Sequence, residues 1–296
     1  MTALALERDV PVARLTTIGT GGPARLLARP QSVSELASAL HLAREEGLEP
    51  FVVGLGSNVL AADEGVDALV VRLEGELASV SVADGLLAAG GGATNAVCLH
   101  RARAAGLGGF EFACAIPGTA GGGVFMNAGA YRSDWSDVLV RALVVSTDAE
   151  EWRTPETLGL EYRHSALAPG EVVARVEYRL VPRAPQDIKA TVADLVARRK
   201  GTQPTNKRTF GSVFRNPTGE LGAGRMLELC GLKGHRIGGA MISPKHANFI
   251  ENADGATTAD CLALMTEARR RAREEFGVEL QREVVIAGLP ELNALT

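Results

Sequence analysis

The chain has 296 residues, of which 46% are hydrophobic, and a formal net charge of -4. This length fits two or three small domains, and the apolar content excludes a chain that is disordered throughout. The net negative charge disfavours a broad surface for nucleic acid, and the sequence contains no run of 18 apolar residues that would predict a membrane span.

The first part of the chain predicts alternating helix and strand. Ser32-Val33-Ser34-Glu35 has the form of a helix capping box, and apolar residues at helical spacing follow it as far as Gly47. A short buried strand at 51–53 leads into the turn Gly54-Leu55-Gly56-Ser57-Asn58, and residues 68–71 form the next strand. We therefore expect a small β-α-β unit here.

The second part predicts a sheet with a glycine-rich turn. Gly90-Gly91-Gly92 leads into a helix at about 94–105. The stretch from Ile116 to Tyr131 is rich in glycine and poor in charge, but its apolar residues exclude a solvated linker. The strands are expected around residues 77–89, 138–147 and 171–181.

Two prolines within Pro182-Arg183-Ala184-Pro185 indicate a domain boundary. The pattern beyond this boundary again mixes helix and strand. The predicted elements are helices at about 186–200, 223–230 and 257–276, and strands at 212–214, near 237–250 and at 278–287.

The cysteine and histidine patterns give no support to a metal site. The four cysteines have no CxxC spacing, and cysteines this sparse are typical of reduced thiols in the cytoplasm. The five histidines form no HExxH pair. We expect a cytoplasmic protein without a bound metal ion.

Two glycine-rich motifs are candidates for binding a phosphorylated ligand. The glycines of residues 54–58 follow a strand and let backbone N–H groups turn toward a phosphate, although an ordinary strand-end turn gives the same pattern. The second motif combines Thr119 and Asn127 with closely spaced glycines. A flavin ring with its pyrophosphate would suit such a wall, and close packing of a helix on a sheet is the alternative.

Three further positions are candidates for acid–base or charge-stabilising chemistry. Arg163 offers a permanent cation suited to a carboxylate or an enolate, although a surface arginine would look the same in sequence. Ser212 lies between a glycine and a predicted strand, where its hydroxyl could donate a proton; no Gly-x-Ser-x-Gly motif supports a hydrolase. Strand alternation puts Glu283 on the same face as Val285, either toward solvent or as an acid.

As a set, these motifs resemble the UDP-N-acetylenolpyruvoylglucosamine reductase family from Leu15 to Gly288. The short connection from Tyr162 to Gly211 resembles the subclass that lacks a loop with a substrate-binding tyrosine. The order and spacing of the motifs are together specific. They are Thr17–Ala24, the turn at 54–58, Gly109–Ala113, Ile116–Tyr131, Tyr162–Ser165, Gly211–Pro217, Gly234–Gly239 and Glu283-Val284.

The resemblance implies an α+β fold. A two-part FAD-binding domain of the vanillyl-alcohol-oxidase (PCMH) type is expected at 1–75 and 76–185, with a C-terminal α+β substrate domain at 186–296. The implied activity is the NADPH-dependent, FAD-mediated reduction of an enolpyruvyl ether on a UDP-sugar to UDP-N-acetylmuramate, for peptidoglycan synthesis. FAD is expected to be non-covalent, because Asn58 stands where oxidase relatives often carry a flavin-linking histidine. We expect a monomer whose partner is the UDP-sugar.

The resemblance also implies roles for single residues. Arg163, Ser212 and Glu283 would be catalytic and would converge at the reactive edge of the flavin, with Ser212 as the proton donor. Tyr162, Asn216 and His246 would contact the substrate. FAD would be bound by Gly54, Gly56, Ser57, Asn58, Pro117, Gly118, Thr119, Gly121, Gly122, Asn127, Ala128 and Gly129.

Four positions depart from the family pattern. Ala120 and Gly123 replace residues more often seen as Val and Ala, so we expect a slightly looser flavin loop. Phe210 precedes the Gly-Ser pair where Ala or Cys is usual, which predicts a tighter pocket beside Ser212. Thr202 stands where a lysine is common, so Lys200 or Lys207 would supply that charge.

Two other functions fit parts of the pattern. One is an oxygen-using flavin oxidase of the same fold, and the other is a non-catalytic protein that binds a flavin or a UDP-sugar. The presence of Arg163, Ser212 and Glu283 together argues against both.

Overall fold

The computed structural model describes residues 4–289, which form two compact units. Unit 1 comprises residues 4–8, 26–55 and 68–198, and unit 2 comprises residues 9–25, 56–67 and 199–289. The chain therefore passes between the units several times. The three predicted domain ranges, which also include residues outside the described part, stay a prediction.

Unit 1 is built around an antiparallel five-stranded sheet in the order β12-β11-β13-β7-β6. Strict alternation would put Val172, Ala174, Val176 and Tyr178 on one face of β13, but the pairing of β13 with β11 has a register shift between the partners Val173 and Arg175. As a result Val176 and Tyr178 are buried in one core, and Val172 and Ala174 are buried in the other. The sheet therefore has a core on each side. Its strands are β6 (Val80–Ala83), β7 (Leu86–Gly90), β11 (Leu139–Val145), β12 (Glu150–Arg153) and β13 (Val172–Arg179).

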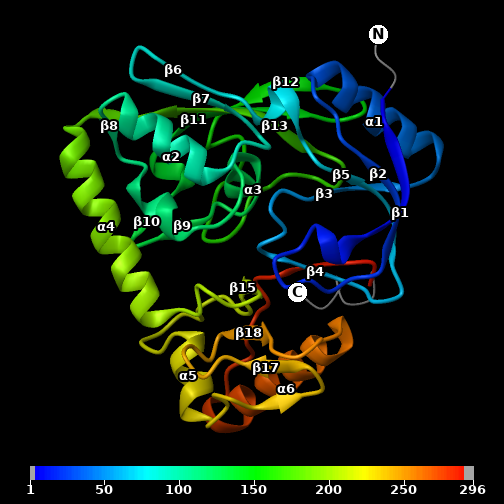
Figure 1. Cartoon of the computed structure of the whole chain (residues 1–296), viewed down its shortest axis with the longest axis vertical. Coiled ribbons are helices and arrows are strands. Elements are labelled where there is room, and N and C mark those ends of the chain that lie inside the picture. Colours follow the sequence, from blue (N-terminus) through cyan, green and yellow to red (C-terminus); the bar gives the residue numbers. More distant parts are fainter. Residues whose placement is uncertain (1–3, 290–296) are drawn as a thin grey trace. The chain divides into compact units, whose positions relative to one another are not determined.

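Helices cover both faces of this sheet (Figure 1). The apolar residues of α1 (Val33–Glu45) belong to one core, and those of α2 (Asn95–Ala104) and α3 (Ala120–Phe125) belong to the other. The predicted capping box is present, because the Ser32 hydroxyl accepts a hydrogen bond from Glu35 N at 3.2 Å. The Glu35 carboxylate accepts one from Gln31 N at 2.8 Å.

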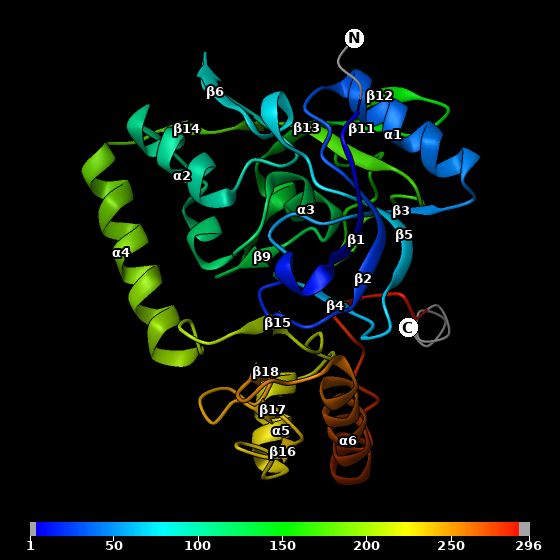
Figure 2. The same ribbon diagram turned by 45° about the vertical axis from the view of Figure 1, so that its right-hand side comes forward.

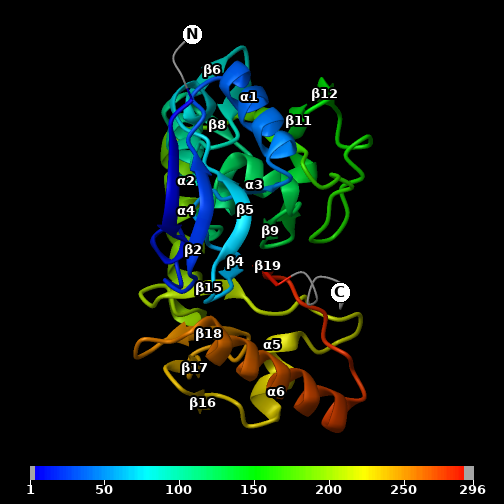
Figure 3. The same cartoon turned by 90° about the vertical axis from the view of Figure 1, so that its right-hand side faces the viewer.

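A second sheet has the order β1-β2-β5-β3, with β3 (Glu49–Val52) parallel to β5 (Val66–Val71). The strands β1 (Leu6–Pro11), β2 (Pro23–Ala28) and β5 each contribute residues to both units. Figure 3 shows β2 and β5 of this sheet side by side. The remaining elements of residues 68–202 are short, apart from α4. They are η2 (Gly75–Ala78), β8 (Leu107–Gly108), η3 (Glu111–Ala115), β9 (Gly129–Ala130), β10 (Ser133–Asp134), η4 (Trp135–Asp137), β14 (Val181–Pro182) and α4 (Pro185–Thr202).

Unit 2 has a four-stranded sheet in the order β15-β18-β17-β16, which packs against α5 (Ala223–Leu229) and α6 (Thr258–Phe276) (Figure 2). Phe210, Phe214 and Leu264 are buried in its core. The strands are β15 (Thr209–Ser212), β16 (Arg236–Ile237), β17 (Ala240–Ile242) and β18 (Phe249–Asn252). Unit 2 also contains η1 (Val12–Arg14) and a parallel pair formed by β4 (Val59–Ala61) and β19 (Val285–Ala287).

An early segment of the chain is anchored to the first turn of α6. Asp63 accepts hydrogen bonds from Thr258 N and Ala259 N, both at 2.9 Å. A carboxylate at a helix N-terminus satisfies donors that have no intrahelical partner and complements the helix dipole. The Thr258 hydroxyl donates to Ala61 O at 2.6 Å. Residues 56–67 are thereby part of unit 2.

Most predicted elements are confirmed, and two strands differ in position. The strand expected at 212–214 is Thr209–Ser212, and Phe214 beyond it forms an isolated bridge with Arg282 instead of extending the strand. Of the strand expected at 278–287, the regular part is Val285–Ala287. No helix within residues 4–289 combines the length and the apolar character that crossing a bilayer requires.

Candidate functional site

The glycine-rich start of α3 lies against the turn that follows β7. Backbone hydrogen bonds join Ala120 N to Ala93 O and Gly121 N to Gly91 O, both at 2.8 Å. The Thr119 hydroxyl then accepts a hydrogen bond from the first turn of α3 at 3.4 Å. The two glycine-rich stretches of the second sequence segment therefore form one local structure in unit 1.

Side chains would not fit at several glycines of this structure. A Cβ atom on Gly121 would lie 3.0 Å from both Gly91 O and Val173 O. A Cβ atom on Gly54, at the end of the turn after β3, would lie 2.5 Å from the Thr119 hydroxyl oxygen. Gly54 and Thr119 come from separate predicted flavin motifs, and the fold brings them into contact.

Asn127 fixes the chain just after α3. Its backbone has a φ of +36°, in the left-handed region that asparagine tolerates better than most residues. Its side chain is only 2% exposed. Nδ2 donates to Glu161 O at 2.9 Å, and Oδ1 accepts from Ser136 N at 3.1 Å. The amide therefore joins the exit of the glycine-rich loop to a distant segment of unit 1.

That distant segment is the turn that carries Tyr162 and Arg163. The Arg163 guanidinium donates to Gly129 O at 2.6 Å and lies 4.9 Å from the centre of the Tyr162 ring. The Ser165 hydroxyl donates to Phe125 O at 2.7 Å. The φ of Arg163 is +56°, so its backbone is also left-handed. The predicted catalytic arginine thus lies beside the predicted flavin loop.

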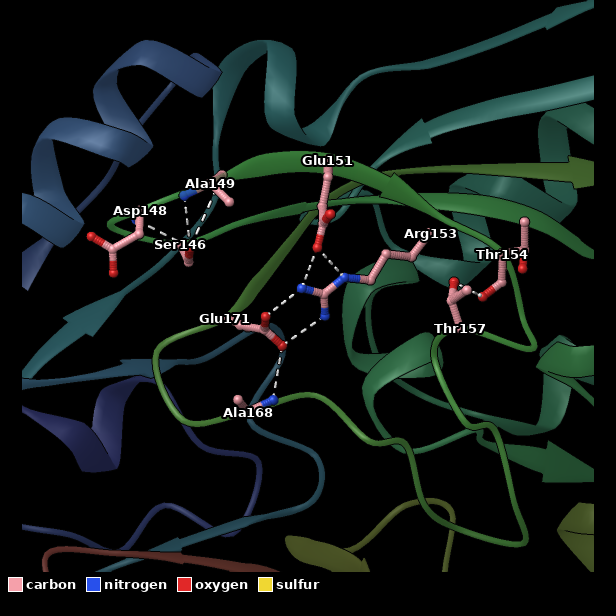
Figure 4. A network of polar contacts seen from close by, with 9 residues as sticks. All are labelled: Ser146, Asp148, Ala149, Glu151, Arg153, Thr154, Thr157, Ala168 and Glu171. Atoms are coloured by element: carbon pink, nitrogen blue, oxygen red, sulfur yellow. Dashed lines mark hydrogen bonds and ion pairs between the residues drawn. The ribbon is translucent and has the colours of Figure 1, made fainter.

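An ion-pair network closes the base of the loop that carries this turn (Figure 4). Arg153, at the end of β12, binds both carboxylate oxygens of Glu171, at 2.9 and 2.5 Å. Glu171 also accepts from Ala168 N at 2.8 Å, and Arg153 donates to Glu151 at 2.6 Å. The hydrogen bond from Arg153 lowers the pKa of Glu171. Residues 154–170 are therefore enclosed by a bidentate pair, the strongest geometry for these groups.

Unit 2 brings Ser212 and Glu283 together through the main chain. Glu283 N donates to Val213 O at 2.9 Å, and Val213 follows Ser212 directly. Asn58 lies on the other side, where its Nδ2 donates to Glu283 O at 3.1 Å and its carbonyl accepts from Val285 N at 3.0 Å. Three segments that are far apart in the sequence therefore meet at Glu283.

The adjacent turn explains the glycine before Ser212. Gly211 has a φ of +83°, and a Cβ atom on it would lie 3.1 Å from Ser57 O. A larger residue here would be strained and would press on the turn at 56–58. Ser57 and Ser212 are thus on segments in close contact.

The predicted substrate residues Asn216 and His246 both lie at the start of α5. Asn216 Oδ1 accepts from Ala223 N at 3.0 Å. The His246 ring lies so close to Gly224 that a Cβ atom there would be 2.5 Å from His246 Cε1. Burial lowers the pKa of His246, and the positive charge of Lys233 adds to this effect. The ring is therefore neutral at pH 7.

Sequence reasoning missed two arginines near these residues. Arg215 Nε is buried and has no hydrogen-bond partner among the described residues. Arg282 forms a β-bridge with Phe214, and burial lowers its pKa, with contributions from Arg269 and Arg215. An anion would stabilise such a group of cations. Both arginines could have been proposed as anion-binding residues from the sequence, because Arg215 directly precedes Asn216 and Arg282 directly precedes Glu283 in the motifs selected there.

Asn95 gives a test of whether unit 1 suits FAD. It is 2% exposed, and its Nδ2 donates to Ile116 O at 3.0 Å. Its Oδ1 has no hydrogen-bond partner in the described part of the chain. A buried acceptor without a partner is costly, and FAD carries hydroxyl and ring N–H donors that could satisfy it. Together with the glycine-lined surface, this atom fits a bound flavin nucleotide.

Two of the departures from the family pattern have a packing explanation. A Cβ atom on Gly123 would overlap the ring of Trp135, which is fully buried. The space left by glycine is thus filled by tryptophan, so the expectation of a looser loop is wrong at this position. Phe210 is also fully buried, in the core of unit 2. The structure explains nothing specific about Thr202.

The predicted site residues fall into both units, and their roles stay predictions. Among the described residues, no group of three or more His, Cys, Asp or Glu side chains could hold a metal ion. Unit 1 holds Gly54, Pro117, Gly118, Thr119, Gly121, Gly122, Asn127, Ala128, Gly129, Tyr162 and Arg163, and unit 2 holds Gly56, Ser57, Asn58, Ser212, Asn216, His246 and Glu283.

Two family models match the chain. The model described as UDP-N-acetylenolpyruvoylglucosamine reductase, C-terminal domain, matches residues 203–287. The model of an FAD binding domain matches residues 24–154. The matches leave residues 155–202, which include Arg163, outside both models.

Full-length relatives cover nearly all of the chain. The UDP-N-acetylenolpyruvoylglucosamine reductase of Anaeromyxobacter dehalogenans (strain 2CP-C) is 44% identical over 281 residues, which are 95% of this chain and 85% of that protein. The protein of the same name from Rubrobacter xylanophilus is 42% identical over 288 residues, 97% of this chain and 96% of that protein.

A solved structure is similar over the same extent. The crystal structure of UDP-N-acetylenolpyruvylglucosamine reductase from Thermus caldophilus has a TM-score of 0.85 and 37% sequence identity to this chain. The match covers 96% of this chain and 99% of that one.

Proposed function

Because the chain belongs to the UDP-N-acetylenolpyruvoylglucosamine reductase family, we propose that it reduces UDP-N-acetyl-3-O-(1-carboxyvinyl)-glucosamine to UDP-N-acetylmuramate for peptidoglycan synthesis. The predicted fold class is confirmed: an FAD-binding domain of the vanillyl-alcohol-oxidase type is combined with a C-terminal α+β domain. The enzyme is an oxidoreductase that uses FAD, with NADPH as the hydride donor. When bound against the glycine-lined surface around Gly54 and Gly121, FAD would supply the hydride transfer from NADPH to the methylene carbon of the enolpyruvyl group.

Ser212 supplies the proton that completes the reduction. Hydride addition leaves an electron pair on the carbon next to the substrate carboxylate, and one proton must reach that carbon. A serine hydroxyl is a weak acid, so it donates only to a strong base such as this carbon. The position of Ser212 beside Val213, whose carbonyl accepts from Glu283 N at 2.9 Å, supports this role.

Arg163 and Glu283 stabilise the negative charge before the proton arrives. Arg163 brings a permanent cation, and its contacts with Gly129 O and the Tyr162 ring support a fixed orientation. One preorganised donor of this kind is worth roughly 3–4 kcal/mol of barrier. Tyr162 is 52% exposed, which supports a role as part of a wall against the substrate.

FAD is held by backbone and small side chains in this proposal. The polar atoms are those of Thr119, Ser57 and Asn58, and the close backbone approach at Gly54 and Gly121 supports binding of a flat group. The UDP-sugar is bound near Asn216 and His246, with Arg215 as an additional contact to the diphosphate. We also propose that the enzyme acts in the cytoplasm and, through wall synthesis, in cell shape and cell division.

One observation carries the proposal for the site: Glu283 is bonded through its main chain both to the residue after Ser212 and to Asn58. The test separates the two half-reactions by stopped-flow absorbance of the flavin. NADPH should bleach the flavin under nitrogen, and the enolpyruvyl UDP-sugar should restore its colour.

The Ser212→Ala variant should keep the first step within about twofold and lose about 100-fold or more in the second. If the sugar does not restore the colour of the wild-type flavin, the proposed function is wrong. If air restores it rapidly instead, the protein is an oxidase.

A further inference from the structure

Both polar atoms of the buried Asn127 amide are engaged within the protein. Both ends of its amide are bonded inside the protein, to Glu161 O at 2.9 Å and to Ser136 N at 3.1 Å. The side chain is 2% exposed. Its position in the glycine-rich motif suggested a cofactor ligand, but its hydrogen bonds connect two pieces of the protein.

The partner of Asn127 controls the position of Arg163. Glu161 and His164 close a tight turn through two backbone hydrogen bonds, at 3.0 and 3.1 Å, and Arg163 lies within this turn. A displacement of the Glu161 carbonyl therefore displaces the Arg163 backbone as well. The bond from Asn127 fixes this carbonyl in unit 1.

The turn needs such a tie because its backbone is strained. Arg163 has a φ of +56°, a conformation that costs a residue with a Cβ atom about 1 kcal/mol or more. Strain of this kind persists only where surrounding contacts hold it. The contacts that hold the turn include the bond from Asn127 to Glu161, the bond from Arg163 to Gly129 and the bond from Ser165 to Phe125.

We propose that Asn127 is a positioning residue, which holds the Arg163 turn against the exit of the glycine-rich loop and does not act as a primary FAD ligand. Ser165 has the same function from the other side of the turn. This inference rests on the proposed function, because it assigns Arg163 to the reduction of the enolpyruvyl group. It predicts that Asn127 matters for the second half-reaction and hardly at all for FAD affinity.

Two substitutions remove the hydrogen bond from Asn127 to Glu161 O and still allow the left-handed backbone conformation of residue 127. Asn127→Asp keeps the acceptor for Ser136 N and replaces the donor to Glu161 O with a repelling oxygen. Asn127→Gly removes both bonds without adding charge. Asn252→Asp in unit 2 is the matched control, because Asn252 also bonds a carbonyl, Ile18 O at 3.0 Å, and a backbone N–H, Ala256 N at 2.9 Å.

The expected result is a split between the half-reactions. Both Asn127 variants should slow flavin reoxidation by the sugar about 10–100-fold, as outer contacts of functional groups typically do. The FAD dissociation constant and flavin reduction by NADPH should stay within about twofold. Asn252→Asp should change none of the three. In the Arg163→Ala background, Asn127→Asp should have no further effect on reoxidation, because it acts through Arg163.

A second readout is independent of activity. Hydrogen exchange of a peptide that covers residues 160–166 should be about tenfold faster in the Asn127 variants and in Ser165→Ala, with FAD bound, but not in Asn252→Asp. If exchange is unchanged, the inference is wrong. A tenfold loss of FAD affinity with normal exchange would show that Asn127 is a cofactor ligand. If the wild-type protein does not reduce the sugar, the proposed function is wrong. The hydrogen-exchange rates would still show whether Asn127 holds the Arg163 turn in place.

Discussion

The two groups of candidate residues are held in place by different kinds of contact. In unit 1, the Arg163 turn is tied to the glycine-rich loop by side chains: Asn127, Ser165 and the Arg163 guanidinium itself. In unit 2, the segments that carry Ser212 and Glu283 are joined by main-chain hydrogen bonds. A single substitution can remove the first kind of tie, whereas the second kind survives most substitutions.

This difference predicts how variants of the two groups should behave. A neighbour of Arg163 can be changed without touching the substrate, and activity should still fall. A neighbour of Ser212 acts mostly through its backbone, so only replacement of the functional group should have a large effect. The predictions that follow test this contrast, beginning with the largest effect.

Replacing Arg163 should give the largest change in unit 1. Arg163→Ala should slow flavin reoxidation by the sugar about 100- to 1000-fold, because a charge-stabilising donor is lost. Arg163→Lys should recover little, because an ammonium cannot both bond Gly129 O and stack on Tyr162 as the guanidinium does. Stopped-flow absorbance measures the rates. Equal slowing of flavin reduction by NADPH would show that Arg163 supports the fold and not the second step.

Features that depend on residues close together in the sequence, such as helix boundaries, were predictable from the sequence. The capping box at Ser32 and Glu35 correctly indicated α1, and the boundaries of α6 follow from Thr257 at its start and the left-handed Gly277 at its end. The roles of Arg163, Ser212 and Glu283 were predicted from the resemblance of the whole set of motifs to a known family, because each residue taken alone also fits an ordinary surface or strand position.

Features that depend on distant contacts were not predictable from the sequence. Helix α3 contains Gly121, Gly122 and Gly123, which are poor helix formers, and it is stabilised because the backbone N–H groups of its first turn are bonded to Gly91 O and Ala93 O. The ties of the Arg163 turn join residues 34 to 40 positions apart. No local pattern identifies such partners.

A methyl group in the glycine-rich loop should have opposite effects at two neighbouring positions. Gly123→Ala should destabilise the protein by about 1–3 kcal/mol, because its Cβ atom would overlap the buried Trp135 ring. Gly122→Ala is the matched control: the nearest atom to its Cβ is 3.5 Å away, so helix propensity should make it neutral or slightly stabilising. Urea unfolding of the FAD-free protein measures both, because Gly122 is itself a predicted FAD contact. Equal stability of the two variants would contradict the packing explanation.

The ion pair below the Arg163 turn should give a smaller effect, limited to one pH range. Arg153 lowers the pKa of Glu171 from its ordinary value of 4.5, so the pair stabilises the fold fully above that pH and loses this contribution as the pH falls through the lowered value. Glu171→Gln should cost about 1–2 kcal/mol at pH 7, and the cost should be smaller at pH 3 than at pH 7.

Glu151→Gln serves as the control for this pair. Glu151 bonds the same arginine, but it is 51% exposed, compared with 14% for Glu171, so its loss should cost less than half as much. Urea unfolding at both pH values measures the difference. If the two variants have the same cost, the bidentate pair does not set the stability of the loop.

His246 should give the smallest effect, at a higher pH, in unit 2. Burial lowers its pKa from 6.5, so the folded protein holds a neutral ring while the unfolded chain binds a proton below that pH. The free energy of unfolding should therefore fall on acidification below pH 6.5, by at most about 1.4 kcal/mol per pH unit. His246→Asn should flatten the profile between pH 7 and pH 5.5. An unchanged profile in His246→Asn would show that the ring titrates as it does in water.

If both expectations hold, a plot of the free energy of unfolding against pH distinguishes the two units. The contribution of His246 in unit 2 is lost as the pH falls below 6.5, and that of the Arg153–Glu171 ion pair in unit 1 is lost only below pH 4.5.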